Sequence, residues 1–288
     1  MIGVSPAFFL SLYREDFTLE DCGRALSLSA GLGFGGFQLE VFKKEELVRW
    51  RGRGTRELAA RSRELGLRAT QFVAHCLLPD FSSAAGLKGE GGREEVERII
   101  EIVAPFASCR LITLPLGPFS VDWSEDGAGR SSFYRFLLER LSEKLARILE
   151  ALEGADLCLA LEILPRALVS GSEGFLRLRE ALGSKRLGFN FDTGHAWACK
   201  EEVALLPFKL EGKIFGTHLR DNFGGEDLAL RPGLGSIPWA PLLKNLKASG
   251  YKGSLDLEIR CRPEEVEKEY GGGLAFIRSL GGRRDHGS

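Results

Sequence analysis

Four acidic or imidazole side chains recur in the second half of this 288-residue chain, each at the end of a short apolar run. They are Glu162, Asp192, His218 and Glu258, in the segments LALE, FNFD, IFGTH and LDLE. The spacings of 30, 26 and 40 residues (162 to 192 to 218 to 258) each fit one strand and one helix. If the four strands are parallel neighbours in a closed sheet, all four side chains meet at one end of it.

Three carboxylates and one imidazole are suitable ligands for one divalent metal ion, such as Mn, Mg, Co or Zn. Carboxylates gathered in a partly dry pocket repel one another, and a bound dication is the simplest way to keep them all ionised. Taken singly, a carboxylate at a strand end more often caps a helix or forms a salt bridge. The four together predict a metal site.

Two further strand ends carry polar residues. Glu40 ends the run FQLE, and His75 ends TQFVAH. Both side chains could recognise substrate hydroxyl groups at the same mouth, or serve as capping or core residues.

The elements that would position these residues alternate regularly along the chain. Eight apolar runs are predicted as strands: Ile2–Val4, Gly36–Val41, Arg68–Ala74, Leu111–Leu116, Leu157–Ile163, Leu187–Phe191, Ile214–Leu219 and Leu255–Ile259. Eight amphipathic stretches are predicted as helices: Leu19–Ala30, Thr55–Leu65, Arg93–Phe106, Ser131–Leu152, Glu173–Leu182, Glu201–Leu210, Trp239–Ala248 and Glu264–Leu280.

This alternation predicts an α/β protein with a single (β/α)8 TIM barrel. Runs such as LCLALEI are apolar on both faces, which is typical of a parallel sheet covered by helices. A doubly wound open sheet would show a glycine-rich turn after the first strand, and Ser5-Pro6-Ala7-Phe8 follows there instead. We expect the barrel to span residues 1–280, with 281–288 as a flexible tail. The long break at 77–92 is a candidate lid.

Composition restricts the function classes. Lys plus Arg total 39 and Asp plus Glu 40, a balance that disfavours a basic nucleic-acid binder. No uncharged apolar stretch reaches the roughly 18 residues of a membrane span, and the N-terminus lacks a signal-peptide pattern. Six scattered cysteines without a CxxC pair indicate a reducing compartment. We therefore expect a cytoplasmic protein that binds neither membrane nor nucleic acid.

Three motifs carry a family resemblance: FNFDTGHA at Phe189–Ala196, HLRDN at His218–Asn222 and PGLGSIPW at Pro232–Trp239. With them the chain resembles the xylose isomerase-like TIM barrels, which include sugar isomerases and epimerases, inosose dehydratases and AP endonucleases. The resemblance implies that Glu162, Asp192, His218 and Glu258 are the metal ligands. It also implies that His195 faces the substrate or a second metal.

The sequence departs from individual branches of that family. The Asp-x-His pair of the endonuclease branch would fall on Asp227 and residue 229, which is Ala229. Arg166 matches an arginine of the ketose 3-epimerases, but two further positions of that branch hold Leu168 and Gly224. A three-metal nuclease and that particular epimerase substrate mode are both disfavoured.

The expected activity is a divalent-metal-dependent isomerase or epimerase of a sugar or polyol ketone. Glu162 and Glu258 would move a proton next to a metal-chelated carbonyl, through an enediolate. His195, His75, Glu40, Arg166 and Arg220 are candidates for binding substrate oxygens, although strand alternation favours an Arg220 side chain that points away from the pocket.

Three alternatives stay open: an inosose-type dehydratase on the same metal site, an AP-endonuclease-like phosphodiesterase, and a non-catalytic sugar-binding barrel. A small-molecule sugar or polyol is the expected partner, and assembly into a homo-oligomer is left open.

Overall fold

The computed structural model describes residues 1–122 and 132–281 of the chain. Eight parallel strands lie side by side in the order β7-β6-β5-β4-β3-β2-β1-β8. Their bounds are β1 Ile2–Val4, β2 Gly36–Glu40, β3 Arg68–Val73, β4 Leu111–Leu116, β5 Cys158–Ile163, β6 Leu187–Asp192, β7 Ile214–His218 and β8 Leu255–Leu257. The ring closes where Leu219, just after β7, pairs with Leu257 of β8. The predicted single (β/α)8 TIM barrel is confirmed.

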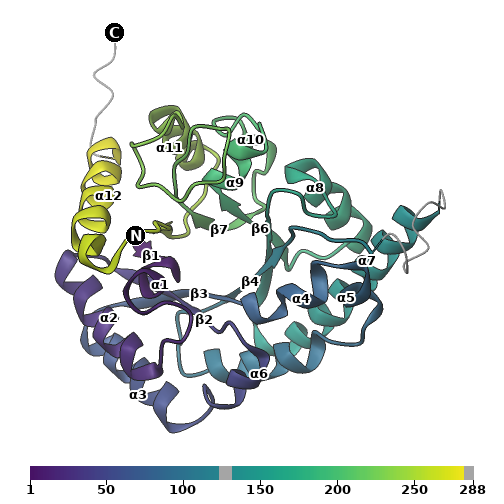
Figure 1. Ribbon diagram of the computed structural model, residues 1–288, viewed down its shortest axis with the longest axis horizontal. Helices are drawn as coiled ribbons and strands as arrows, with labels where there is room; N and C mark the ends of the chain where they lie inside the picture. The colour runs from purple at the N-terminus through teal and green to yellow at the C-terminus, as the bar shows by residue number, and fades with distance from the viewer. Residues whose placement is uncertain (123–131, 282–288) are drawn as a thin grey trace.

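Helices form an outer ring around the strands (Figure 1). Eight of them lie in the predicted stretches: α2 Leu19–Leu32, α3 Arg53–Glu64, α6 Arg93–Val103, α7 Phe133–Leu152, α8 Gly171–Leu182, α10 Leu206–Lys209, α11 Trp239–Ala248 and α12 Val266–Gly281. The helix predicted over Glu201–Leu210 is much shorter than expected, because only α10 is helical there and residues 203–205 form a turn before it. The predicted start of α7 at residue 131 lies outside the described residues. Of the predicted tail, 281–288, only Gly281 is described, and it is the last residue of α12.

The structure contains four short helices that the periodicity did not predict. They are α1 Ala7–Tyr13, α4 Leu78–Phe81, α5 Ala84–Lys88 and α9 Thr193–Ala198. Helices of one or two turns contain too few apolar positions to show a 3.6-residue period. They lie in the segments that follow β1, β3 and β6, at the end of the barrel where the polar strand ends lie.

The segment 77–92, expected to be a lid, contains α4 and α5. Phe81 and Leu87 are buried there. The ammonium group of Lys144 on α7 donates to the carbonyl oxygen of Gly86 at 2.8 Å and to that of Gly89 at 3.1 Å. These contacts fasten the segment to the helical ring, which explains why it is ordered and not an open loop.

Side chains inside the barrel form layers because strand residues alternate between the two faces of the sheet. Apolar residues such as Phe37 of β2 and Phe191 of β6 are buried on the face toward the helices. The opposite face carries polar residues two positions apart, as in the pairs 38 and 40, 190 and 192, and 256 and 258. One polar layer therefore lies at the strand ends and a second lies directly beneath it.

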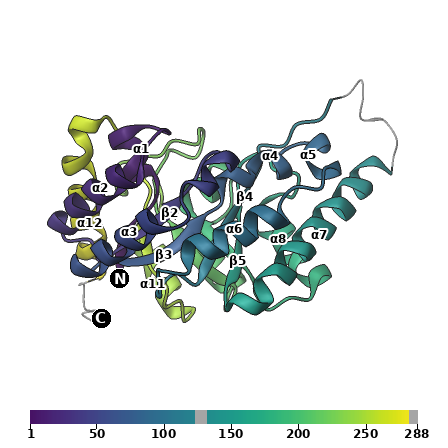
Figure 2. The same cartoon turned by 90° about the horizontal axis from the view of Figure 1, so that it is seen from below.

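The first and last elements of the described barrel meet where it closes. β1 pairs with β8, and Figure 1 shows the purple N-terminal elements beside the yellow helix α12. The rings of Phe8 and Tyr270 pack edge to face there, with centroids 4.7 Å apart. The side view in Figure 2 shows the same neighbourhood of α1, α2 and α12. This closure brings β8 next to β1, whose other neighbour is β2, so that residues 38 of β2 and 256 of β8 can meet in the barrel interior.

Within the described residues, no helix is long and apolar enough to cross a membrane.

Candidate metal centre

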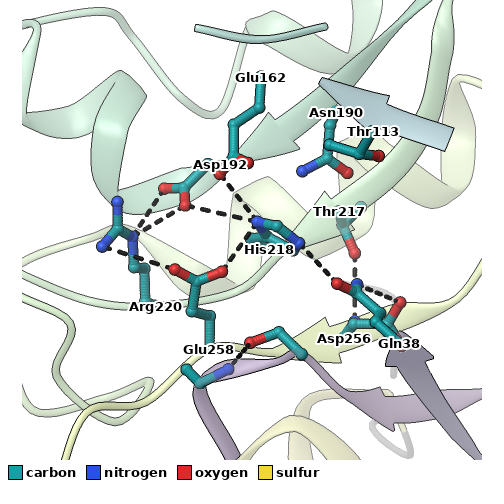
Figure 3. Close-up of polar contacts among 12 residues, drawn as sticks. Gln38, Thr113, Glu162, Asn190, Asp192, Thr217, His218, Arg220, Asp256 and Glu258 are labelled. Atoms are coloured by element: carbon teal, nitrogen blue, oxygen red, sulfur yellow. Dashed lines mark hydrogen bonds and ion pairs between the residues drawn. The ribbon is translucent and has the colours of Figure 1, made fainter. Parts of the chain in front are cut away.

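The four residues predicted to form a metal site converge on one point. Glu162, Asp192, His218 and Glu258 each offer a ligand atom, and these atoms lie within 4.8 Å of one another. Nδ1 of His218 is 2.8 Å from Oε1 of Glu162, 2.8 Å from Oε2 of Glu258 and 4.0 Å from Oδ2 of Asp192. Figure 3 shows the three carboxylates arranged around the imidazole.

Strand geometry explains the convergence. Glu162 is in β5, Asp192 ends β6, His218 ends β7, and Glu258 follows β8 directly. These positions are at the carboxyl ends of four consecutive strands, and parallel strands in a barrel direct those ends to one mouth.

The carboxylates and the imidazole of the cluster favour each other's charged forms. Burial alone would raise the pKa of Glu162, but the charge of His218 and its hydrogen bond outweigh that effect and hold the pKa below its usual value. The pKa of Glu258 is likewise lowered, because His218 and Arg220 outweigh its burial. The same carboxylates raise the pKa of His218 well above 6.5, against the effect of burial. A positive charge is thus favoured at the point between the carboxylates.

This donor set fits a divalent cation. Carboxylate oxygens and an imidazole nitrogen are ligands for Mn²⁺, Mg²⁺, Co²⁺ and Zn²⁺, and the imidazolium of His218 supplies the positive charge that such an ion would bring. The side chains of Glu162, Asp192 and His218 are at most 6 % exposed, so water screens their charges only weakly.

Asp192 has a second contact, because it also caps the helix that follows it. Its Oδ1 accepts a hydrogen bond from the backbone N–H of His195 at 2.7 Å, at the start of α9. Capping fixes the carboxylate at the strand end and places His195 one turn along, facing the cluster. Burial raises the pKa of Asp192, in spite of the charges of Arg220 and His195.

Arg220 points into the site, so the expectation that strand alternation turns it away from the pocket is wrong. It lies two residues after His218, so both belong to the same face of the chain. Its Nε is 2.8 Å from Oδ2 of Asp192, and its Nη2 is 3.1 Å from Oδ1 of Asp227. The guanidinium is 6 % exposed and is already bound to carboxylates. Arg220 therefore orients acidic groups, and its role as a substrate ligand stays a prediction.

His195 and Asp227 form a second contact beside the cluster. Nε2 of His195 is 3.2 Å from Oδ2 of Asp227, and its Nδ1 faces Asp192 and Glu162 at 3.5 and 3.6 Å. The bond to His195 lowers the pKa of Asp227, although burial acts in the opposite direction. The sequence did not predict Asp227 as a site residue, because it lies in the irregular segment after β7. The only signal was its place in a motif of the endonuclease branch.

Glu40 and His75 line the same cavity, which has a volume of about 220 Å³. Glu40 is 5 % exposed, and its Oε2 lacks a hydrogen-bond partner among the described residues. Burial, followed by the charge of Glu258, raises the pKa of Glu40 well above 4.5. Burial also lowers the pKa of His75, whose ring lies 4.9 Å from that of Phe42. Both groups are thus favoured in their neutral forms.

The structure separates two positions that the family resemblance singled out, Arg166 and Ala229. Arg166 lies just beyond β5 with a φ of 65°, and its side chain is exposed. It is not among the described residues that line this cavity. The structure therefore does not bring it together with the other predicted substrate ligands. Ala229 does line the cavity, where the endonuclease branch would place a histidine. A methyl group offers no metal ligand at that position.

A polar layer beneath the cluster was missed by sequence analysis. Its side chains, fully or almost fully buried inside the barrel, are Gln38, Gln71, Thr113, Asn190 and Asp256. Three of them precede a predicted site residue by two positions, in the patterns QLE, NFD and DLE. This spacing of two was the available signal, because residues two apart share a strand face.

Comparison with known proteins agrees with this architecture. The family model described as xylose isomerase-like TIM barrel matches residues 26–280. An uncharacterized protein of Methanocaldococcus jannaschii is 29% identical over 151 residues, which are 49% of this chain and 51% of that protein. The aligned part thus spans about half the length of this relative.

Solved structures share the fold at low sequence identity. The 3-keto-D-glucoside 4-epimerase YcjR from E. coli is 19% identical, covers 96% of this chain and 98% of its own, and has a TM-score of 0.73. The IOLI protein, solved with a bound zinc atom, is 17% identical, covers 97% and 96%, and has a TM-score of 0.71. At these identities the likeness shows a shared barrel and leaves the reaction open.

Proposed function

The chain belongs to the xylose isomerase-like TIM barrel family, and on that premise we propose that it is a divalent-metal-dependent isomerase or epimerase of a small sugar or polyol ketone. One observation carries the proposal. Glu162 and Glu258 come from β5 and from the end of β8, line one cavity, and have carboxylates 2.8 Å from the same nitrogen of His218. Two carboxylates beside one cation site could take a proton from a substrate carbon and return it.

Glu162, Asp192, His218 and Glu258 would hold the metal ion in this proposal. When bound, a divalent ion acts as a Lewis acid that polarises a substrate carbonyl and makes the neighbouring C–H more acidic. Asp192 and His218 supply ligands only, since Asp192 is also engaged with Arg220 and with α9.

The protonation states of the two glutamates suit the transfer of a proton. A general base must be ionised before it accepts a proton. In the metal-free protein the positive charge of His218 lowers the pKa of Glu162 and Glu258, and a bound dication would take over that effect. Glu258 is the more accessible of the two, with 16 % of its side chain exposed against 6 % for Glu162. If one glutamate takes the proton and the other returns it, the carbon is inverted; if one does both, the proton moves along the substrate.

The rest of the cavity suits neutral hydroxyl groups. Glu40 in its protonated form can donate one hydrogen bond and accept others, and the neutral imidazole of His75 can do both. The volume of about 220 Å³ is below the roughly 300–1,000 Å³ of cavities that hold drug-sized ligands. A monosaccharide or a cyclitol ketone fits this size better than a polymer.

A substrate panel in deuterated water tests the proposal. The purified protein, loaded with Mn²⁺, Co²⁺, Mg²⁺ or Zn²⁺, is incubated with ketoses, aldoses and inososes, and products are followed by NMR. Metal-dependent entry of deuterium next to a carbonyl, with a changed configuration or carbonyl position, supports an isomerase or epimerase. Deuterium entry with loss of water identifies a dehydratase. Failure of every metal to promote exchange with any of these substrates would overturn the proposal.

A phosphodiesterase is disfavoured by Ala229, which leaves the cavity without the histidine that the nuclease branch carries at this position. Cleavage of an abasic-site oligonucleotide, assayed in parallel, would reverse that inference.

A further inference from the structure

The second ring nitrogen of His218 faces away from the metal cluster, into the polar layer beneath it. Nε2 is 2.8 Å from Oε1 of Gln38, and both side chains are almost completely buried. Figure 3 shows this contact on the side of the imidazole opposite Glu162. At this distance one of the two atoms must donate a proton to the other.

The partner on the far side of Gln38 decides which atom donates. Nε2 of Gln38 donates to Oδ2 of Asp256 at 2.9 Å. Burial raises the pKa of Asp256, but its Oδ2 is the acceptor of three donors, Gln38, Ser254 and Thr70, so this oxygen offers no proton to Gln38. The amide of Gln38 therefore turns its NH₂ toward Asp256 and its oxygen toward His218. The oxygen of Gln38 has no proton to give, so Nε2 of His218 must carry one.

Asp256 is itself held in place. Its Oδ2 also accepts from the hydroxyl groups of Ser254 at 2.7 Å and of Thr70 at 3.0 Å. Gly3 of β1 leaves the room for this carboxyl group, because a Cβ at that position would lie 2.2 Å from Oδ1 of Asp256. Asp256 is fully buried, so no solvent competes for these bonds.

Gln71 on the neighbouring strand is the competing partner. Its Nε2 lies 3.3 Å from Nε2 of His218 and 3.4 Å from Oδ1 of Asn190, while its oxygen accepts from Thr113. A bond from Gln71 to His218 would need a bare Nε2, which would place a lone pair against the oxygen of Gln38 only 2.8 Å away. The shorter contact therefore determines the proton position.

We propose that Gln38 and Asp256 are positioning residues that hold His218 in the tautomer with its proton on Nε2. A neutral imidazole carries one ring proton, so this arrangement leaves the lone pair of Nδ1 pointing between Glu162 and Glu258. Buried partners of this kind orient histidine ligands and strengthen metal binding. The role rests on the metal site of the proposed function, but it does not depend on which substrate is converted.

The test compares Gln38→Met with Gln71→Met, since both glutamines lie within 3.3 Å of the same nitrogen. Histidine-labelled protein is studied by ¹⁵N–¹H NMR with Zn²⁺ bound, and Zn²⁺ affinity is measured by competition with a chelator. In the parent protein and in Gln71→Met we expect one exchange-protected Nε2–H from His218. In Gln38→Met we expect that signal to be lost and affinity to fall about 10- to 100-fold.

Gln38→Glu gives a rescue that controls for misfolding. The new carboxyl can share one proton with Asp256 and still present an oxygen to Nε2, so the protected signal should return. Circular dichroism verifies that each variant is folded.

Equal Zn²⁺ affinities for Gln38→Met and the parent protein, or an equal loss in Gln71→Met, would overturn the positioning role alone. Absence of Zn²⁺ binding in the parent protein would overturn the proposed function as well.

Discussion

Arg220 binds Asp192 with its Nε 2.8 Å from Oδ2, the same oxygen that lies 4.0 Å from Nδ1 of His218. The remaining guanidinium nitrogens lie 3.1 Å from Asp227 and 3.7 Å from Glu258. One buried cation thus contacts three carboxylates at the edge of the metal cluster. It reduces the repulsion among them and fixes their directions before any metal arrives.

Arg220→Met should destabilise the metal-free protein. Removal of one partner of a buried ion pair leaves the other charge uncompensated and typically costs about 3–5 kcal/mol. Urea unfolding in the presence of a chelator measures this loss directly.

Arg262→Met is the matched control, because Arg262 forms a similar contact with Glu265 at 2.8 Å, but its side chain is 70 % exposed. An exposed pair of this kind contributes little to stability, because water and salt screen its charges. Equal losses in the two variants would show that the buried position of Arg220 has no special effect.

Glu258→Gln should keep the fold and lose most turnover on any substrate identified by the panel. The amide can no longer accept a proton, and positioned general bases contribute about 10²–10⁴-fold to rate. The initial rate of deuterium exchange at saturating metal measures the effect. Glu264→Gln is the control: it makes the same change at an exposed position six residues further along the sequence, and it should retain the parent rate. A Glu258→Gln variant with undiminished exchange would remove Glu258 from the mechanism.

Glu40→Gln should change how stability depends on pH. The folded-state pKa of Glu40 is raised well above 4.5, so the fold favours its protonated form. The stability that it contributes is complete below pH 4.5 and is lost as pH rises toward the raised pKa, by about 1.4 kcal/mol per pH unit.

A glutamine has no proton to lose, so the free energy of unfolding of the variant should rise relative to that of the parent protein as the pH increases. Unfolding of both metal-free proteins by urea at several pH values between about 5 and 8 reveals it. A constant difference across that range would contradict the raised pKa.

Metal affinity should rise with pH. Without metal, Glu162 and Glu258 raise the pKa of His218 well above 6.5, and a proton occupies Nδ1. The incoming ion must displace that proton, so affinity should increase up to about tenfold per pH unit below the raised pKa. Calorimetry in buffers of different ionisation enthalpy should detect about one proton released per metal bound. An affinity that stays flat over this range would contradict the assignment.

The barrel was predictable because each strand is a short apolar run of its own, and all eight were confirmed. The cluster itself followed from residues at four strand ends, each a carboxylate or an imidazole at the end of an otherwise apolar run. Arg220, two residues beyond His218, could have been placed on the same face by the alternation of strand residues.

The remaining features depend on contacts distant in sequence. Asp227 meets His195 through an irregular segment that has no period to read. Gln38 and Asp256 are 218 residues apart, and they meet only because β8 closes against β1. The short helices α4 and α5 are fixed by burial and by Lys144, and sequence pattern alone does not reveal such anchoring.

Anomalous diffraction from crystals of the chain grown with Mn²⁺ or Zn²⁺ tests the central claim most directly. We expect a single strong peak among Glu162, Asp192, His218 and Glu258, about 2.0–2.2 Å from an oxygen or nitrogen of each. A peak elsewhere in the molecule, or no peak at saturating metal, would contradict the claim that these four side chains bind one divalent ion.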